Sequence, residues 1–349
     1  AGRCFAKSIR SRIGGRMDKI LEIKNLSIGF KDKKEETPVV KNISFSLFEG
    51  EVLAIVGESG CGKSVTAKSL MGLLPDENAT IYSESQVIYK GENILQYNEK
   101  QWTNYCGKEC AMIFQDSMAA MNPTMTVGKQ IAENLRIHQK MTKREALKRA
   151  ALALKEVGIN DSDKRVKQYP HEFSGGMRQR SMIAMAIVCN PRILIADEPT
   201  TALDVTIQIQ ILQLMKELKE KNKMSILLIT HDLGVVAGMA DRIAVMYAGK
   251  IVEMGEYEDI YYHSKHPYTR SLLDAVPRLD ISEKEKMKSI KGMPPGPEEK
   301  IEGCVFAPRC PYCMRICLEE EPILQLHENE HSYACWLDAA YKCTGEYPF

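Results

Sequence analysis

A glycine-rich stretch that ends in a lysine and a serine is the part of this sequence best suited to chemistry. Residues 57–64 read Gly-Glu-Ser-Gly-Cys-Gly-Lys-Ser, which fits the pattern G-x-x-x-x-G-K-[ST]. Glycines let the backbone curl around an anion with its N–H groups turned inward, and the positive end of a following helix faces the same anion. The spacing predicts a phosphate-binding loop, with Lys63 on the β- and γ-phosphates of a nucleotide and the Ser64 hydroxyl on Mg²⁺. A chance glycine-rich turn is the alternative.

Two adjacent carboxylates, Asp197 and Glu198, offer a second part of a phosphoryl-transfer site. They follow the apolar run 192–196, which has the length of a buried strand. Downstream of a phosphate loop, one such acid suits Mg²⁺ and the other suits an attacking water. A solvated turn is the alternative, and a strand this apolar disfavours it. His231 lies just past the apolar run 225–229; a lone histidine is more often structural, but this position favours a catalytic role.

Two further stretches offer contacts to a nucleotide. Residues 174–179 read Ser-Gly-Gly-Met-Arg-Gln and open a helical pattern, so a second helix N-terminus is available to a phosphate. Phe30 ends a strand-like run at residues 20–30. Its ring either stacks on an adenine base or belongs to the core, and the pattern leaves these two interpretations even.

Hydrophobic patterns predict the elements that must position these residues. Apolar residues that alternate or run continuously indicate strands at 20–30, 39–47, 52–56, 86–89, 112–114, 192–196, 225–229, 242–247 and 250–253. Helical spacing indicates a helix at 64–74, a helical insertion within 126–158 that Gly158 ends, and a helix with Ile207, Ile211, Leu214 and Leu218 on one face. The charged run 31–36 is expected to be a solvated hairpin loop. An antiparallel β-layer thus leads into the strand before the phosphate loop.

Length, charge and hydrophobicity limit the classes of protein to which this chain can belong. The 349 residues suffice for one large domain and a smaller one. Lys and Arg number 47 against 46 Asp and Glu, so no basic field favours nucleic acid. The longest apolar run, 182–189, falls well short of the roughly 18 residues of a membrane span, so a membrane is expected to be reached through partners. Residues 1–16 are basic and acid-free, and are expected to be a vector leader ahead of Met17.

The cysteines are unevenly distributed and crowd the end of the sequence. A clustered set without a secretory signal is more often a metal or cluster site than a disulfide framework. Four thiolates at wide spacing come from Cys304, Cys310, Cys317 and Cys335, while Cys313 and Cys343 are surplus. Thiolates are soft ligands, so zinc and a [4Fe–4S] cluster are the two candidates, and ligand chemistry alone leaves them even.

The order of these motifs resembles the nucleotide-binding subunit of ATP-binding cassette transporters, over about residues 21–253. The most specific feature is a phosphate loop followed by Ser-Gly-Gly-x-x-Gln just ahead of an Asp-Glu pair. More closely, the sequence is similar to the dipeptide and oligopeptide importer branch. This similarity rests on VGESGCGKS at 56–64, IADEPTTALDVT at 195–206, HPYT at 266–269 and the cysteine tail.

The resemblance implies an α/β fold of the P-loop NTPase type. An antiparallel β subdomain, a helical subdomain at about residues 116–176 and a small C-terminal cysteine-rich domain would complete it. The implied limits are 17–260 for the ATPase domain, 261–303 for a linker and extension, and 304–349 for the cysteine-rich domain, in which a [4Fe–4S] cluster becomes favoured over zinc.

The resemblance also implies roles for individual residues. Phe30 would stack on adenine, Glu198 would polarise the attacking water, and His231 would contact the γ-phosphate. Gln115 would sense both Mg²⁺ and the membrane partner. Phosphates would be held by Gly57, Ser59, Gly60, Cys61, Gly62 and Lys63, and Mg²⁺ by Ser64, Gln115 and Asp197. Ser174, Gly175 and Gly176 would close over ATP bound to the opposite subunit, with Gln179 and Asp204 also at the nucleotide.

The implied activity is ATP hydrolysis that drives import of di- and oligopeptides from the cytoplasmic face of the cell membrane. The implied partners are a homologous ATPase subunit, in a homodimer or heterodimer, two transmembrane permease subunits and, indirectly, an extracellular or periplasmic substrate-binding protein, with no nucleic acid. One alternative is a related importer ATPase for nickel or another small solute. The other is a soluble cassette protein that acts on ribosomes or DNA.

Overall fold

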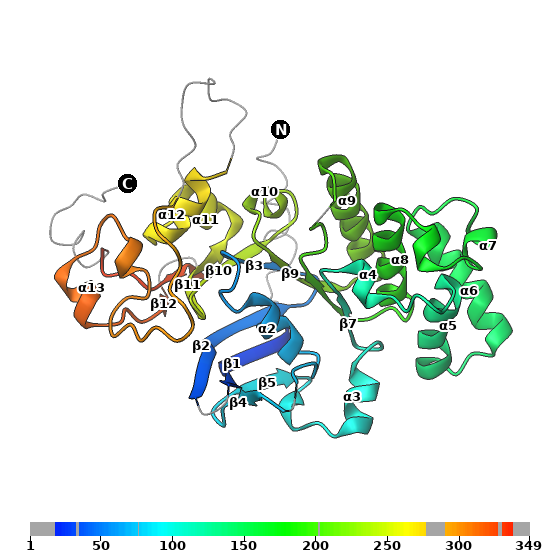
Figure 1. Ribbon diagram of the computed structural model, residues 1–349, viewed down its shortest axis with the longest axis horizontal. Helices are drawn as coiled ribbons and strands as arrows, with labels where there is room; N and C mark the ends of the chain where they lie inside the picture. Colours follow the sequence, from blue (N-terminus) through cyan, green and yellow to red (C-terminus); the bar gives the residue numbers. More distant parts are fainter. Residues whose placement is uncertain are drawn as a thin grey trace.

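A mixed central sheet positions the predicted site in the computed structural model, which describes residues 18–32, 35–75, 77–201, 203–276, 290–326 and 330–337. Its strand order is β12-β13-β11-β10-β3-β9-β8-β7 (Figure 1). Neighbouring strands from β10 to β7 run parallel, whereas β11, β12 and β13 pair antiparallel. The bounds are β3 (Val52–Val56), β7 (Cys110–Ile113), β8 (Ile193–Asp197), β9 (Ser225–Thr230), β10 (Arg242–Tyr247), β11 (Lys250–Glu256), β12 (Gln325–Leu326) and β13 (Ser332–Tyr333).

The inner strands of this sheet are apolar along their whole length because both faces are covered. Every residue of β3, β8 and β9 is buried, as expected for parallel strands between two layers. The predicted strands at 52–56, 192–196 and 225–229 are thereby confirmed. Because the carboxyl ends of parallel strands meet at one edge of a sheet, the residues that follow β3, β7, β8 and β9 converge there.

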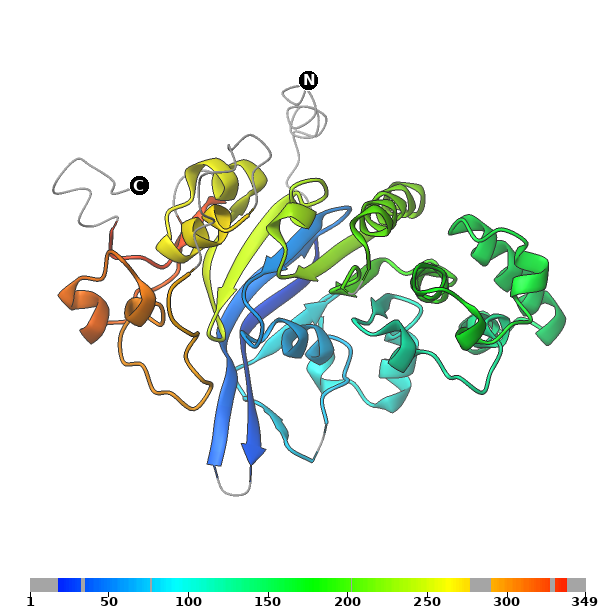
Figure 2. The same ribbon diagram turned by 45° about the horizontal axis from the view of Figure 1, so that its top comes forward.

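A second, antiparallel sheet forms the expected β-layer. It has the order β2-β1-β5-β6, with β4 also paired to β1. The bounds are β1 (Lys19–Asp32), β2 (Glu35–Phe48), β4 (Ala79–Ile81), β5 (Gln86–Tyr89) and β6 (Glu92–Asn93). The hairpin expected at 31–36 is confirmed, but its strands reach further than expected, since Lys31 stands opposite Glu36 in the ladder. Strands β1 and β2 project well beyond the body of the molecule (Figure 2).

Helices lie on both sides of the central sheet and beyond its β7 edge. Those before the Asp-Glu pair are α2 (Lys63–Ser69), α3 (Glu99–Tyr105), α4 (Ser117–Ala120), α5 (Val127–His138), α6 (Lys143–Glu156), α7 (Ser162–Arg165) and α8 (Gly175–Ile187). Those after it are α9 (Val205–Asn222), α10 (Leu233–Val236), α11 (Tyr257–His263), α12 (Pro267–Asp274) and α13 (Arg315–Glu319). Among the described residues, no helix combines the length and apolar character needed to cross a membrane.

The helical subdomain expected near 116–176 is present as α4 to α7, to the right in Figure 1. Helix α6 starts with a capping box, in which Thr142 and Glu145 bond each other's backbone N–H groups. It ends at Glu156, and Gly158 follows with a φ of 79°, which confirms the predicted stop. Helix α2, in contrast, ends at Ser69 and not at residue 74, because the chain turns at Gly72, whose φ is 63°.

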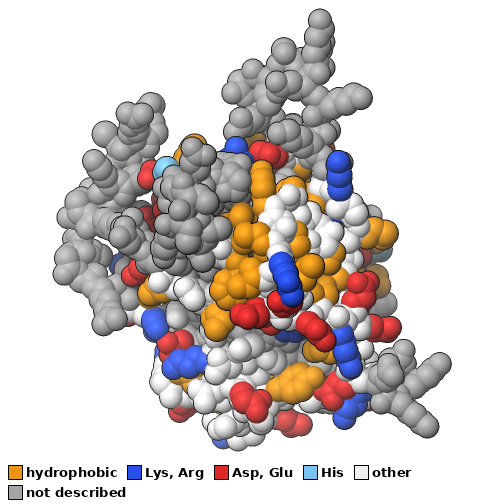
Figure 3. Space-filling view, turned by 90° about the vertical axis from the view of Figure 1, so that its left-hand side faces the viewer, with side chains coloured by type: hydrophobic (Ala, Val, Ile, Leu, Met, Phe, Trp, Pro, Cys, Tyr) orange, Lys and Arg blue, Asp and Glu red, His pale blue; other side chains and the backbone are white. Residues whose placement is uncertain are grey.

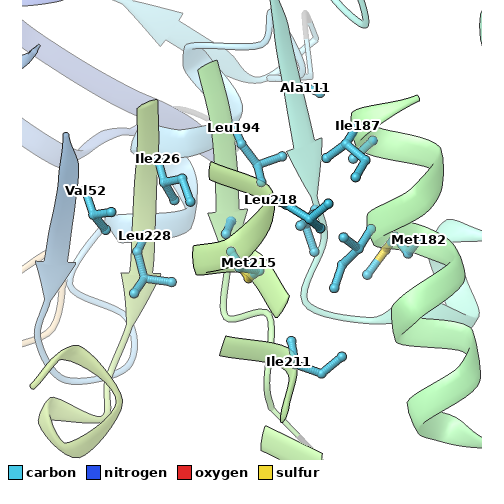
Figure 4. Packing of buried hydrophobic residues seen from close by; sticks show 14 of the residues in the cluster. Val52, Ala111, Met182, Ile187, Leu194, Ile211, Met215, Leu218, Ile226 and Leu228 are labelled. Carbon is cyan, nitrogen blue, oxygen red and sulfur yellow. The ribbon is translucent and has the colours of Figure 1, made fainter. Parts of the chain in front are cut away.

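The two faces of the central sheet pack against different partners. On one face, Leu194 and Ile226 lie in the same core as Met215 and Leu218 of α9 and Met182 of α8 (Figure 4). On the other face, the alternate residues of the same strands belong to the core shared with the antiparallel sheet and α2. This double burial holds the strand ends, and therefore the site, in a fixed arrangement.

The described part of the cysteine tail packs onto the central sheet, although a small domain of its own was expected. Strand β13 pairs with β11 at Glu253 and Met254, and Phe306 lies in the same core as Tyr247 and Tyr268. Burial of apolar groups in a shared core explains why this short segment needs no separate core. Figure 3 views this side of the molecule, where apolar side chains gather between charged ones. Two predictions fall outside the described residues. These are the leader at residues 1–16 and the surplus Cys343.

Candidate functional site

The phosphate loop has the strand and helix context that its motif predicts. Strand β3 leads into the loop, and helix α2 begins at Lys63. Gly57 is required because a Cβ there would lie 2.1 Å from the Met246 carbonyl oxygen. Gly62 has a φ of 102°, which a side chain would strain. The loop therefore depends on its glycines both for space and for backbone conformation.

Lys63 is folded under the loop that it is predicted to serve. Its Nζ donates to the carbonyl oxygens of Gly57, at 2.8 Å, and Glu58, at 2.9 Å, and the residue is buried. The Sγ of Cys61 lies 3.8 Å from the same nitrogen. Burial raises the pKa of the Cys61 thiol, so this side chain stays protonated and acts as a small apolar filler.

Ser64 and Asp197 meet as the predicted Mg²⁺ site requires. The Ser64 hydroxyl donates to Oδ1 of Asp197 at 2.9 Å, at the end of β8. Asp197 is buried, and this burial raises its pKa although Ser64, Lys68 and Lys63 favour the charged form. A buried carboxylate beside a hydroxyl offers hard oxygen donors, which suit Mg²⁺. The residues present therefore fit this ion.

Glu198 is the centre of a cluster of polar side chains. Its Oε2 accepts hydrogen bonds from Nε2 of Gln115 at 2.9 Å and from the Thr201 hydroxyl at 2.8 Å. Its Oε1 lies 3.1 Å from Nδ1 of His231. Three residues named as catalytic candidates, Gln115, Glu198 and His231, thus come together from the ends of β7, β8 and β9. Thr201 is not among the residues that the sequence places in the site. In the sequence, only its position three residues after Glu198 indicates that it could contact this carboxylate.

The environment of Glu198 keeps it ionised. Burial alone raises its pKa, but the hydrogen bonds of His231 and Thr201, with the charges of His231 and Lys63, outweigh burial and lower it. The residue also has a φ of 46°, in the left-handed region that costs free energy for a side chain of this kind. An ionised, held carboxylate is what a group that orients water requires.

The second glycine-rich turn starts helix α8 and lies against the turn before α9. Ser174 caps α8 by accepting a hydrogen bond from the Met177 N–H at 3.4 Å. Asp204 caps α9 in the same way, through the Ile207 N–H at 3.0 Å. A Cβ on Gly176 would lie 3.1 Å from the Ile207 side chain, so the two turns touch.

Two residues that were predicted to contact the nucleotide, Gln179 and Phe30, contact other parts of this chain in the structure. Gln179 is buried, and its Nε2 donates to the Pro199 carbonyl at 2.6 Å, so it ties α8 to the residue after Glu198. Phe30 stands opposite Thr37 and Ala79 in the antiparallel sheet and packs partly against its core. The nucleotide-binding roles of both residues stay predictions.

The four cysteines named as ligands influence one another. Burial raises the pKa of the Cys335 thiol to about 12, and the thiols of Cys304, Cys310 and Cys317 add to this rise. The backbone N–H of Cys304 donates to the Cys317 carbonyl at 2.8 Å. Within the described ranges, no three His, Cys, Asp or Glu side chains form a group that could hold a metal ion.

Comparison with protein families divides the chain into two matching regions. Residues 40–201 match the model of the ABC transporter family, and residues 252–317 match the model of the oligopeptide/dipeptide transporter C-terminal region. The second match covers the HPYT stretch and three of the four cysteines named above. The first region contains the phosphate loop and the Asp-Glu pair but ends before His231, and the second begins within β11.

Curated relatives are similar over almost the whole chain. The dipeptide transport ATP-binding protein DppD of Bacillus subtilis (strain 168) is 50% identical over 92% of this chain and 95% of its own length. The oligopeptide transport ATP-binding protein OppD of the same organism is 50% identical over 92% of this chain and 90% of its own length. Among solved structures, the dimeric post-hydrolysis ATP-binding cassette MJ0796, bound to ADP and Pi, matches 68% of this chain and 98% of its own, with 27% identity and a TM-score of 0.61.

Proposed function

This chain belongs to the ABC transporter family, among its dipeptide and oligopeptide transport ATP-binding proteins, and we propose that the site described above hydrolyses the ATP that drives this transport. The observation that carries the proposal is the convergence of Gln115, Glu198 and His231 beside the Ser64–Asp197 pair. These groups follow adjacent parallel strands, at the edge where the phosphate loop also begins.

Each group has a step that its chemistry suits. Lys63 exchanges the carbonyl oxygens of Gly57 and Glu58 for the phosphates, and the loop N–H groups bind the same oxygens. Ser64 and Asp197, with Gln115, would hold Mg²⁺, which when bound would neutralise charge on the phosphates. The ionised Glu198 orients the attacking water and favours loss of its proton.

We propose that a second subunit completes the site, because this one is open on the side of the transferred phosphate. The imidazole of His231 is 56% exposed, and the turn at Ser174 is exposed as well. The related MJ0796 cassette, which is described as dimeric with ADP and Pi, supports a dimer for this chain as well. Exclusion of water by that closure strengthens every electrostatic interaction within the site.

The wider assembly follows from the named relatives, which are transport proteins for dipeptides and oligopeptides. We propose that this subunit pairs with itself or with a homologous ATPase. The pair works on the cytoplasmic face of the membrane with two permease subunits, and a substrate-binding protein delivers the peptide. The test is ATP hydrolysis in vesicles that contain the whole complex. Peptide-loaded binding protein should stimulate the rate, whereas tight association with ribosomes and no stimulation would contradict the proposal.

We also propose that Cys304, Cys310, Cys317 and Cys335 hold a [4Fe–4S] cluster. The support is the softness of thiolate ligands and the backbone hydrogen bond that holds Cys304 beside Cys317. A cluster is wider than one ion, so its thiolates need not form the tight group that a single zinc requires. Anaerobically purified protein should be brown and contain iron and sulfide.

A pair of cysteine variants tests this assignment. Cys310→Ser should lose the brown colour, and Cys313→Ser should keep it, since Cys313 is exposed and surplus. Colourless protein with stoichiometric zinc would establish zinc as the metal instead.

A further inference from the structure

An arginine beside the cysteine tail forms an ion pair with a residue of the phosphate loop. Arg309 Nη1 and Nη2 donate to Oε2 and Oε1 of Glu58 at 2.6 and 3.0 Å, in a two-pronged ion pair. Glu58 is the second residue of the loop, 251 positions earlier in the chain. The side chain of Arg309 is 4% exposed and that of Glu58 is 27% exposed, so solvent screens this pair less than a pair in which both partners are exposed. Planar forks of this kind fix geometry as well as supply energy.

The arginine is itself held in place on its other edges. Its Nε donates to the Lys291 carbonyl at 3.0 Å, and Nη1 also donates to the Tyr247 hydroxyl at 3.2 Å. The guanidinium lies 5.7 Å from the centre of the Tyr247 ring, within the range of a cation–π contact. Because its rotamer is already fixed by these contacts, Arg309 can locate Glu58 at little further cost in conformational entropy.

The backbone at the same loop residue is held by the HPYT stretch. The Glu58 N–H donates to the Tyr268 hydroxyl at 2.9 Å, and Tyr268 is fully buried. Its ring centre lies 4.5 Å from that of Tyr247 and 5.3 Å from that of Phe306. Glu58 is therefore held through its side chain and its N–H by residues that lie outside the loop.

The remaining polar group of Glu58 faces the lysine that binds phosphate. Its carbonyl oxygen accepts from Lys63 Nζ, so one residue connects the C-terminal segment to the nucleotide lysine. Segment 295–301 also lines a cavity of about 570 Å³ together with Gly60 of the loop and Val39. A glycine-rich loop has little conformational preference of its own. Contacts from outside the loop therefore determine which fraction of molecules has the conformation that binds ATP.

We propose that Arg309 is a positioning residue for ATP binding, which, together with Tyr268, fixes the phosphate loop in the shape that receives the triphosphate. The segment that carries the cysteines thereby sets part of the ATP affinity of the catalytic domain. Arg309 acts through Glu58 and does not touch the reacting atoms, so its loss affects nucleotide affinity more than the chemical step.

The test compares Arg309→Met, which cannot pair, with a matched control on the same segment. Arg315→Ala removes an exposed pair with Glu319 and should change nothing, since such pairs contribute little. For the purified full chain, Arg309→Met should raise the Kd for a fluorescent ATP analogue and the KM for ATP by about tenfold, with kcat within about twofold. Wild-type affinity in a folded Arg309→Met protein, or an equal loss in Arg315→Ala, would overturn the proposal.

A second variant keeps the proposal testable if Arg309→Met fails to fold. Glu58→Gln retains the shape of the side chain but weakens the ion pair, and should raise Kd about threefold. In the double variant the two effects should not add, because both remove the same interaction. An unchanged Kd in Glu58→Gln, or additive losses in the double variant, would overturn the role assigned to Arg309.

Discussion

The phosphate loop is bounded by two regions that are built in different ways. On the catalytic side, Glu198 contacts side chains near the surface, and His231 is more than half exposed. On the anchoring side, Arg309 and Tyr268 are buried among aromatic rings. The catalytic side must accept ATP, water and a second subunit, so its groups stay accessible. The anchoring side is complete within one chain.

The difference in burial also separates the energetics of the two regions. Exposed ion pairs contribute about 0.2–1 kcal/mol, and removal of one partner from a fully buried pair costs about 3–5 kcal/mol. The Arg309–Glu58 pair lies between these limits, because Arg309 is buried and Glu58 is 27% exposed. Substitutions on the catalytic side should therefore change rate with little effect on folding. Substitutions on the anchoring side should change affinity or stability with little effect on the chemical step.

The largest expected effect lies on the catalytic side. Glu198→Gln should lower kcat by about 10²-fold or more, because an amide cannot take a proton from water, and it should leave ATP binding unchanged. Turnover and the Kd for the ATP analogue are the two measurements. Glu220→Gln, an exposed position on α9, is the control. Near-normal turnover of Glu198→Gln would refute the role of Glu198.

The second-largest expected effect concerns the dimer that is proposed to complete the catalytic side. Glu198→Gln protein should form a dimer in the presence of ATP, detectable by analytical ultracentrifugation. Adding Ser174→Arg should weaken that dimer about 30-fold, because a bulky charged side chain would be forced into a packed interface. If both proteins form the ATP-dependent dimer equally well, the turn at Ser174 does not close over the opposite subunit.

The anchoring side should respond to pH through His266, which caps the helix that carries Tyr268. Burial lowers the pKa of His266 to about 3 from 6.5. The unfolded chain therefore binds more protons below pH 6.5, and stability present above that pH is lost as pH falls toward 3. At pH 5 the loss is about 2 kcal/mol. The facing groups are the Phe306 ring and Glu253, which accepts from the His266 backbone N–H at 3.1 Å.

His266→Asn tests this prediction, because asparagine can still accept from the Tyr268 N–H but does not titrate. Urea unfolding at pH 7 and pH 5 should show a smaller loss of stability in the variant than in the wild type. His263→Asn, an exposed position on α11, is the control and should keep the wild-type pH dependence. Equal losses in all three proteins would exclude His266 as the source.

The smallest expected effect connects the cysteines to the loop. Cys310 follows Arg309 directly, so Cys310→Ser should make the position of Arg309 less fixed and raise the KM for ATP about twofold, or about 0.4 kcal/mol. Cys313→Ser should leave the KM unchanged. A colourless Cys310→Ser protein with a normal KM would show that the cluster and the loop are independent, even if each proposal holds separately.

The catalytic side could be predicted from the sequence, and the anchoring side could not. The phosphate loop is a local motif, and buried parallel strands such as β8 show as apolar runs, so Glu198 and His231 could be placed at strand ends. Gln115 was named only through the resemblance to a family. The Arg309–Glu58 pair joins distant positions through a charged residue that looks like any surface arginine. This pair can be found only when the three-dimensional packing of the chain is known.

Smaller departures have equally physical causes. Gln179 lies in the predicted turn, but its amide satisfies the buried Pro199 carbonyl, a need that the sequence does not display. Strand β13 spans two residues, too short to produce an alternating pattern. The ends of β1 and β2 at Lys31 and Glu36 are charged, so apolar periodicity does not show that the strands continue there.

The pairing of β13 with β11 has a consequence for the growing chain on the ribosome. Domains generally fold as they emerge, yet β11 is synthesised long before Ser332 and Tyr333 appear to cover its outer edge. The buried carboxylate of Glu253 also lacks its contact with His331 until that residue is synthesised; in the complete molecule the two side chains lie 2.8 Å apart. An uncovered strand edge is a template for pairing with other chains. Premature termination before this strand should therefore yield aggregates rather than a shorter active enzyme.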